Sequence, residues 1–359
     1  MSISNLALPP SRLRKALIRC LFAGLTPIVT SSPGIGKSDI VKSIAKEYRL
    51  KLIDFRVPQA DVTDFNGLPF PDPETGKATF RPFDVFPLEG DSLALMLDED
   101  GKVQRDDDGK LITYDGWLIF LDELTSAPKH LQSPAYKLIL DRMVGNQNLH
   151  PRVVIAAAGN EASDNAIVHE LSTALQSRLI HLGLKLDHKE WMDWAIHNGI
   201  DSRILAFLQF KPELLHRFDP NHDEKTFACP RTWSFASRLT KGEDLDMEDL
   251  PLLAGTVSPG VAQEYISFIK VFDELPKMQD ILDKPDTIPV PHEPSIKFAL
   301  ATVLAEKMDE KTAPALCTFL TRMPVECRVL CLRMVRQRNP HLMRNASIQK
   351  VFQPILARM

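Results

Sequence analysis

Apolar and polar residues follow two different periods along this chain, and the period changes near residue 185. In the first half, short apolar runs are separated by segments with helical spacing, which predicts strands that alternate with helices. The predicted strands are 27–30, 50–57, 117–121, 153–158 and 179–184, and the predicted helices are 11–23, 39–48, 130–142 and about 168–177. Because such alternation is typical of a parallel sheet with helices on both faces, we expect a three-layer α/β/α domain.

After residue 184 the pattern is helical to the end. Asp187 and Glu190 form a capping-box pattern before a helix that Gly199 closes. A proline-rich stretch then separates two helical blocks. We therefore expect four parts, which are an α/β domain, an all-α region, a connector and a C-terminal helical segment. Their expected ranges are 1–184, 185–275, 276–296 and 297–359.

Two segments interrupt the first part. Residues 63–87 are dense in proline and phenylalanine and predict an ordered insert. Residues 87–116 hold nine acidic and three basic side chains, with Asp-Gly at 100/101, 108/109 and 115/116. Asp-Gly favours hairpin turns, whereas a calcium loop with Gly101 sixth would lack its first and last carboxylates. We predict solvent-exposed hairpins here and identify no internal repeat in the chain.

Composition narrows the class of protein. The chain has 359 residues, 44% hydrophobic and 25% charged, with a net charge of −4, which excludes a disordered or fibrous protein. Five cysteines without a CxxC pair indicate a reducing compartment, and no apolar run reaches the roughly 18 residues of a membrane span. We expect a cytoplasmic protein. The chain has only 16 glycines against 27 prolines. Where glycines cluster, we therefore expect the backbone to need a conformation that other residues rarely adopt.

Glycines gather between the first predicted strand and the next helix. Gly34 and Gly36 allow backbone amides to point inward at a phosphate, Lys37 can reach the β- and γ-phosphates of ATP, and Ser38 can place a hydroxyl on Mg²⁺. The alternative is a tight turn, and the usual pattern has glycine where this chain has Ser31. The predicted cofactor-binding residues are Ser32, Pro33, Gly34, Ile35, Gly36, Lys37, Ser38 and Asp39, together with Asp122.

Asp122 and Glu123 end the apolar run that begins at Trp117. Ligands bind at the carboxyl ends of strands in open α/β sheets. Asp122 can hold Mg²⁺ through water, with Ser38, and Glu123 can polarise a water for attack on the γ-phosphate. The alternative is that the two carboxylates cap the next helix.

In its glycine loop and in the apolar strand that ends at Asp122 and Glu123, the chain resembles the AAA+ ATPases. Within them it resembles the MoxR-like and dynein-related branch, over at least residues 11–240. Residues 32–38 resemble the Walker A loop, 118–123 the Walker B strand, 156–160 sensor 1, 175–178 the arginine-finger motif and 229–231 sensor 2. The resemblance implies a P-loop sheet of order 5-1-4-3-2, a helical lid over 185–275, and a ring, usually a hexamer, with ATP between neighbours.

The resemblance also implies roles for three further residues. Asn160 would bond the γ-phosphate or the attacking water, Arg178 would be the arginine finger, and Arg231 the sensor 2 cation. Asn160 could instead be a turn residue, and Arg178 a cation favoured by a helix C-terminus. A cation at a predicted helix start is unfavourable for the helix dipole, so a phosphate partner explains Arg231 better, with Arg238 as the alternative.

The insert at 63–87 matches the place where the MoxR-like branch has an insert that faces the ring axis. Four phenylalanines there are candidates for substrate contact, or else pack against their own domain: Phe70, Phe80, Phe83 and Phe86.

Charge is distributed unevenly. Basic side chains are in excess over residues 1–50 and 297–359, but the C-terminal arginines alternate with apolar residues as on a solvated helix face. The leading hypothesis is an ATP-hydrolysing ring that remodels a protein client, in this family often one with a von Willebrand factor A domain. Two alternatives are a nucleic-acid translocase and a nucleotide-gated scaffold with little turnover.

Overall fold

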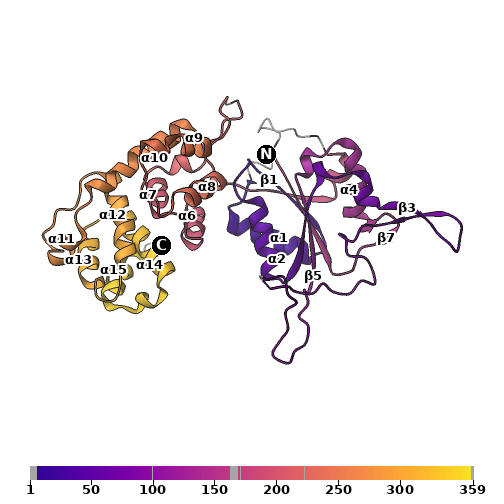
Figure 1. Ribbon diagram of the computed structural model, residues 1–359, viewed down its shortest axis with the longest axis horizontal. Helices are drawn as coiled ribbons and strands as arrows, with labels where there is room; N and C mark the ends of the chain where they lie inside the picture. Colours follow the sequence, from indigo (N-terminus) through magenta and orange to yellow (C-terminus); the bar gives the residue numbers. More distant parts are fainter. Residues whose placement is uncertain (1–5, 99, 162–168, 170, 222, 357–359) are drawn as a thin grey trace. The chain divides into compact units, whose positions relative to one another are not determined.

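The computed structural model describes residues 6–98, 100–161, 169, 171–221 and 223–356. The chain divides into two compact units, residues 1–186 and 187–359, which are described separately (Figure 1). Among the described residues, no helix combines the length and the apolar character needed to cross a membrane.

The first unit is built on five parallel strands. Its helices are α1 (Pro10–Phe22), α2 (Lys37–Glu47), α3 (Val62–Asn66), α4 (Lys129–Leu140) and α5 (Thr173–Gln176). Its strands are β1 (Thr26–Thr30), β2 (Leu50–Arg56), β3 (Leu68–Pro71), β4 (Ala78–Arg81), β5 (Gly116–Asp122), β6 (Met143–Val144), β7 (Gln147–Asn148), β8 (Val153–Gly159) and β9 (Leu179–Gly183). The sheet has the order β2-β5-β8-β1-β9. Counted along the chain, these strands lie in the order 5-1-4-3-2, so the expected topology is confirmed.

Helices cover both faces of this sheet (Figure 1). On one face, α1 and α2 bury Leu17 and Val41 in a cluster with Val29 of β1 and Phe120 of β5. On the other face, α4 buries Leu138 in a second cluster, which includes Ile119 and Leu121 of β5. Since β5 lies inside the sheet and is covered on both faces, its run is apolar throughout rather than alternating. The three-layer fold predicted from the sequence is confirmed.

One predicted helix is shorter than expected. Helix α5 begins only at Thr173, where Ser172 Oγ caps it by accepting a hydrogen bond from the Leu175 amide. The expected start at residue 168 lies outside the described residues. A serine at the N-cap explains the start at 173 better than apolar spacing alone.

The insert forms an antiparallel hairpin of β3 and β4 that extends away from the sheet (Figure 1). Phe70, Phe80 and Phe83 are exposed, and the Arg81 guanidinium lies 4.2 Å from the centre of the Phe70 ring. Phe86 is only 1% exposed and packs 5.4 Å, between ring centres, from Phe55 of β2. For Phe86 the packing alternative therefore holds, and substrate contact is wrong.

Two of the three Asp-Gly pairs form the expected hairpin turns. Gly101 and Gly109 have φ of 76° and 77°, in the left-handed region that glycine tolerates. The third pair is different, because Gly116 is the first residue of β5. A side chain at Gly116 would lie 2.4 Å from the Arg152 carbonyl oxygen, so this glycine permits close strand packing instead of a turn.

The second unit is helical. Its helices are α6 (His188–His197), α7 (Ser202–Phe210), α8 (Pro230–Thr240), α9 (Leu250–Val257), α10 (Pro259–Ile269), α11 (Met278–Asp283), α12 (Pro294–Lys307), α13 (Ala313–Thr321), α14 (Val325–Arg338) and α15 (Ala346–Leu356). Helix α12 packs against both α7 and α14. The residues after the proline-rich stretch therefore share a core with the helices that precede it.

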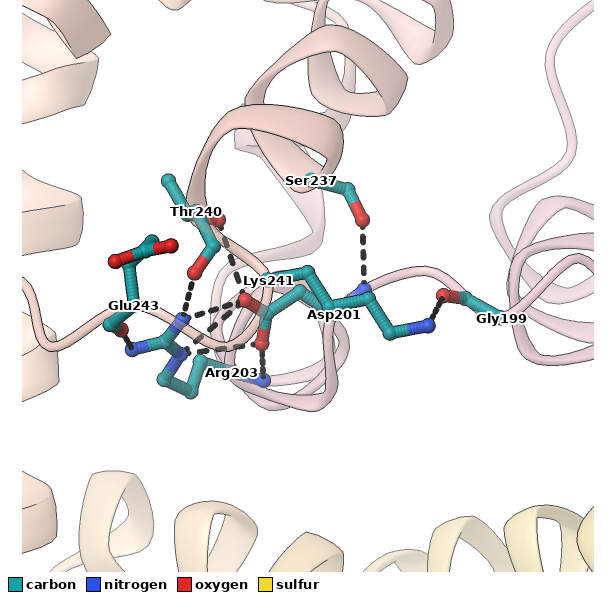
Figure 2. A network of polar contacts seen from close by, with 7 residues as sticks. All are labelled: Gly199, Asp201, Arg203, Ser237, Thr240, Lys241 and Glu243. Carbon is teal, nitrogen blue, oxygen red and sulfur yellow. Dashed lines mark hydrogen bonds and ion pairs between the residues drawn. The ribbon is translucent and has the colours of Figure 1, made fainter.

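A polar network around the ion pair between Asp201 and Arg203 joins the start of α7 to the end of α8 (Figure 2). Asp201 accepts a hydrogen bond at 2.7 Å from Arg203 and another at 3.2 Å from the Thr240 hydroxyl, and its amide donates to Ser237 Oγ at 2.8 Å. Burial lowers the pKa of Arg203, but the hydrogen bond and charge of Asp201 outweigh burial and hold it above the usual value. Burial, and then the Asp201 charge, raise the pKa of the neighbouring Tyr265. Hydrogen bonds with Ser237 and Thr240 of α8 thus accompany the ion pair at the start of α7.

Candidate functional site

The sequence-predicted residues of the first unit gather at the carboxyl edge of the sheet. The loop 31–36 follows β1, Asp122 ends β5, and Asn160 follows β8. Because β5, β8 and β1 are adjacent and parallel, the three segments emerge next to one another.

The glycine loop has the backbone shape of an anion cradle. Gly34 and Gly36 have φ of 78° and 97°, conformations that other residues rarely adopt. Helix α2 begins directly after them at Lys37, and its N-cap residue Gly36 supplies no side-chain cap to the first turn. The amides at the start of a helix and the positive end of its dipole favour an anion such as phosphate at this place.

Lys37 bridges the loop and the neighbouring strand β8. Its Nζ donates to the Ser31 carbonyl at 2.9 Å and the Ser31 hydroxyl at 3.0 Å. It also donates to Asn160 Oδ1 at 3.1 Å. Two residues far apart in sequence are therefore tied through one ammonium group. The sequence does not predict the contact with Ser31, which differs from the usual pattern only in replacing a glycine.

The Ser38 hydroxyl donates to Asp122 Oδ2 at 3.1 Å, so the two predicted Mg²⁺ ligands lie side by side. Both are oxygen donors, and Mg²⁺ prefers one or two protein oxygens completed by water and phosphate. The residues present therefore fit Mg²⁺ with a phosphate ligand.

Glu123 is exposed at the end of β5 and adopts a left-handed conformation, with φ of 58°. Its amide donates to Asp122 Oδ1 at 2.9 Å. A positive φ is costly for a residue other than glycine, and such strain is frequent at functional sites. Since Asp122 Oδ2 accepts the Ser38 hydrogen bond and the Glu123 side chain is exposed, the two carboxylates can serve different roles.

Thr125 fixes the backbone of Asn160. Its buried hydroxyl accepts a hydrogen bond from the Asn160 amide at 3.0 Å and donates to the Asn160 carbonyl at 3.3 Å. A side chain at Gly159 would lie 2.3 Å from that hydroxyl, so only glycine fits there. The sequence analysis did not identify Thr125. The one local feature that could have indicated a role for this residue is its position two residues after Glu123.

Arg178 lies at the opposite edge of the sheet. The register pairs Leu179 of β9 with Thr26, at the start of β1, whereas the phosphate loop follows Thr30 at its end. Arg178 is therefore level with Leu25, and six residue steps of about 3.3 Å place it about 20 Å along the strand from the start of the loop at Ser31. Its guanidinium is exposed, donates to the Ala174 carbonyl at 3.0 Å, and lies 5.3 Å from the Tyr136 ring centre. The fold does not bring Arg178 to the loop of its own chain.

Arg231 is exposed in the first turn of α8 in the second unit, and Arg238 lies 4.9 Å from the Phe235 ring centre. Both belong to the unit that does not contain the phosphate loop. Their phosphate contacts remain predictions.

No protein-family model matches the sequence, and no curated protein matches it. Solved structures with a similar fold include one of a putative ATPase from Cytophaga hutchinsonii, at 12% identity and a TM-score of 0.35, covering 99% of this chain and 92% of the other. A mutant of Thermotoga maritima RuvB has 16% identity and a TM-score of 0.38, with 83% of each chain covered. The structure titled RuvB Holliday junction branch migration motor, also from Thermotoga maritima, has 13% identity and a TM-score of 0.31, covering 96% and 87%. All three TM-scores are below 0.5, so these similarities carry no argument about function.

Proposed function

We propose that this chain is an ATPase of the AAA+ class that binds ATP and Mg²⁺ at the carboxyl edge of its sheet. The observation that carries the proposal is the convergence of Lys37, Ser38, Asp122 and Asn160 around an uncapped helix start. A phosphate cradle, oxygen ligands for a divalent cation and a neighbouring carboxylate are together what phosphoryl transfer to water requires.

Each side chain has a role that its position supports. Lys37 and the first-turn amides of α2 bind the phosphates, while Ser38 and Asp122 hold the cation, which neutralises phosphate charge when bound. Glu123, exposed at the end of β5, takes the proton of the attacking water. Asn160 orients that water or the γ-phosphate with its side-chain amide.

We further propose that ATP lies between subunits of a homo-oligomeric ring, which is a hexamer in most of the proteins that the chain resembles. The position of Arg178 supports this, because its side chain is too short to cross the roughly 20 Å along β1 to its own loop. An arginine delivered by a neighbour stabilises the charge that develops on the transferred phosphoryl group. In this arrangement Arg231, in the helical unit that we propose as the lid, contacts phosphate in its own subunit.

MoxR-type remodelling of a protein client is the biological role that we propose, and a protein with a von Willebrand factor A domain is a candidate client. The exposed rings of Phe70, Phe80 and Phe83 support it, because exposed aromatic side chains on a projecting hairpin suit a protein ligand.

The test is steady-state ATP hydrolysis by the Glu123→Gln variant. We expect turnover to fall by a factor of about 10²–10⁴, the usual contribution of a general base, with ATP binding retained. Glu224→Gln, an exposed carboxylate in the second unit, is the matched control and should hydrolyse ATP normally. Unchanged turnover in Glu123→Gln would overturn the catalytic assignment.

The ring proposal has its own test. Arg178→Ala should also lose turnover, and an equimolar mixture of Arg178→Ala and Glu123→Gln should recover part of it. In mixed rings some interfaces pair an intact Glu123 with an intact Arg178. No recovery on mixing would contradict a shared site, and stimulation of turnover by DNA, weakening steeply with salt, would instead favour a nucleic-acid motor.

A further inference from the structure

Residues 94–98 and 100–114 form a ribbon in which a pattern of backbone hydrogen bonds occurs three times, so our expectation of no internal repeat is wrong here. Met96 donates from its amide to the Ile112 carbonyl, Gln104 to Met96, and Ile112 to Gln104, at 2.9, 2.9 and 3.0 Å. These residues are eight apart in sequence and close a triangle of backbone hydrogen bonds. Around the triangle lie three antiparallel bridges, which pair Leu95 with Thr113, Leu97 with Val103, and Arg105 with Leu111.

The two turns of the ribbon repeat one another in detail. Asp98 Oδ1 accepts hydrogen bonds from the amides of Asp100 and Lys102 at 3.0 and 2.8 Å. Asp106 Oδ1 accepts from Asp108 and Lys110 at 3.1 and 2.8 Å. The side chains of the first aspartates therefore shape the turns, and the ribbon is an ordered surface.

The bridges determine which side chains share a face. Residues paired across a bridge point to the same side, and so do residues two apart on one strand. One face consequently carries Leu95, Leu97, Val103 and Leu111, which are 39–52% exposed. The same face carries the bridge partners Thr113 and Arg105, and the Arg105 guanidinium donates a hydrogen bond to the Gly109 carbonyl at 2.7 Å. We call the four apolar residues the ribbon face. The opposite face carries Met96, Gln104 and Ile112, which are half-buried.

Acidic side chains surround the ribbon face at both turns. The exposed carboxylates of the turns include those of Asp98, Asp100, Asp106, Asp107 and Asp108, and they outnumber the exposed ammonium groups of the same turns, Lys102 and Lys110. An ordered apolar surface with an acidic rim suits a protein surface that presents apolar and basic side chains together.

The same unit presents such a surface on α1. Arg12, Lys15, Arg19 and Phe22 are all exposed, and their spacing of three, four and three residues aligns them along one side of the helix. We call these four residues the α1 stripe. Phe22 is 74% exposed and touches Tyr48 edge-on, at 5.3 Å between ring centres, and Leu25 beside it is 49% exposed. Within the part of the chain that the structure describes, both surfaces stay open to solvent.

We propose that a second copy of this chain docks its α1 stripe on the ribbon face. Phe22 and Leu25 then cover the apolar centre, while the basic residues of the stripe meet the acidic turns. The ribbon leads into the first residue of β5, and α1 leads toward the first residue of β1, so both lie at the sheet edge opposite the phosphate loop. The contact therefore goes beyond the proposed ATPase and requires no nucleotide.

Sedimentation of the full-length chain without nucleotide tests this contact. The wild type should self-associate, with a dissociation constant that rises in salt because the charges are exposed. The ribbon variant Leu97→Ser/Val103→Ser should weaken association by at least about tenfold, as loss of buried apolar contacts does in an interface. Glu74→Lys/Asp84→Lys, which changes exposed charges elsewhere in the unit, should not. A monomeric wild type, or a ribbon variant that associates normally, would overturn the proposal.

Charge reversal tests the choice of occupant. Asp107→Lys/Asp108→Lys, which keeps the turn-forming Asp106, and Lys15→Glu/Arg19→Glu should each be monomeric alone and should associate when mixed, since each then offers the surface that the other has lost. If the mixture stays monomeric while both variants retain the wild-type circular dichroism and thermal midpoint, α1 is not the occupant. These measurements use no ATP, so failure of the proposed ATPase activity would not affect them.

Discussion

Lys37 Nζ lies 3.1 Å from Asn160 Oδ1, and this contact joins the loop after β1 to the end of β8. The residue proposed to bind phosphate and the one proposed to orient water are therefore hydrogen-bonded to each other. Phosphate oxygens that compete for Lys37 would release the Asn160 amide, so nucleotide arrival and water orientation are coupled through one ammonium group.

Asn160→Ala should lower ATP turnover by about 10²–10³-fold, as loss of one oriented donor in an active site does. ATP binding should change by no more than about tenfold, because a single hydrogen bond contributes only modestly to it. Parallel measurements of turnover and equilibrium ATP binding check both. Asn148→Ala, exposed on β7, is the control, and a loss confined to binding would contradict the proposed role.

Ser31→Ala should make ATP bind more tightly, by about fivefold. The fully buried Ser31 hydroxyl holds Lys37 at 3.0 Å, so its removal weakens the contacts that phosphate must replace, by about 1 kcal/mol. Ser43→Ala removes an exposed hydroxyl from α2 and serves as the control in the same binding titration. Weaker binding by Ser31→Ala would mean that the hydroxyl contacts the nucleotide itself.

Gly159→Ala should lower the free energy of unfolding by about 1–3 kcal/mol, because the added carbon would lie 2.3 Å from Thr125 Oγ1. The shift would also displace Asn160, so turnover should fall further than stability explains. Gly255→Ala in α9 is the matched control, since nothing lies within 4 Å of its added carbon among the described residues. A helix-interior alanine should raise stability by up to about 1 kcal/mol. Equal effects in chemical denaturation would argue against the steric explanation.

Tyr265→Phe should flatten the loss of stability at alkaline pH. Burial raises the pKa of Tyr265 above its unfolded value of about 10, so the folded state holds this proton more tightly. The resulting stability is fully present below that unfolded pKa and is lost as pH rises above it. Urea unfolding of wild type and variant between pH 8 and about pH 11 measures the difference, which should be small at pH 8. Tyr114→Phe, at a half-buried position, is the control, and parallel curves for wild type and Tyr265→Phe would contradict the assignment.

Much of the site could be predicted from short segments. Gly34 and Gly36 identify a loop that only a few residue types can form, and the apolar run of β5 into Asp122 identifies a buried strand with polar residues at its end. These signals are local, because the backbone conformation of a loop and the burial of a strand both determine the residue types of a few consecutive positions. The positions of Ser38 beside Asp122 and of Asn160 beside Lys37 follow once the strand order is known.

Contacts between distant segments left no such signal. Thr125 fixes Asn160 across 35 residues, and Phe86 proved to be a core residue although its neighbours in the insert are exposed. The ribbon repeats Asp-x-Asp-Gly-Lys at 98–102 and 106–110, but the backbone triangle that makes its pattern threefold joins Met96, Gln104 and Ile112, which share no motif. In this protein the sequence by itself determined the elements, the parallel sheet and the candidate phosphate loop, because helix and strand periodicity and glycine conformations are local properties. Only the tertiary structure decided which side chains meet, that Arg178 lies away from its own loop, and which apolar residues stay exposed, because these depend on strand register and packing between segments distant in sequence.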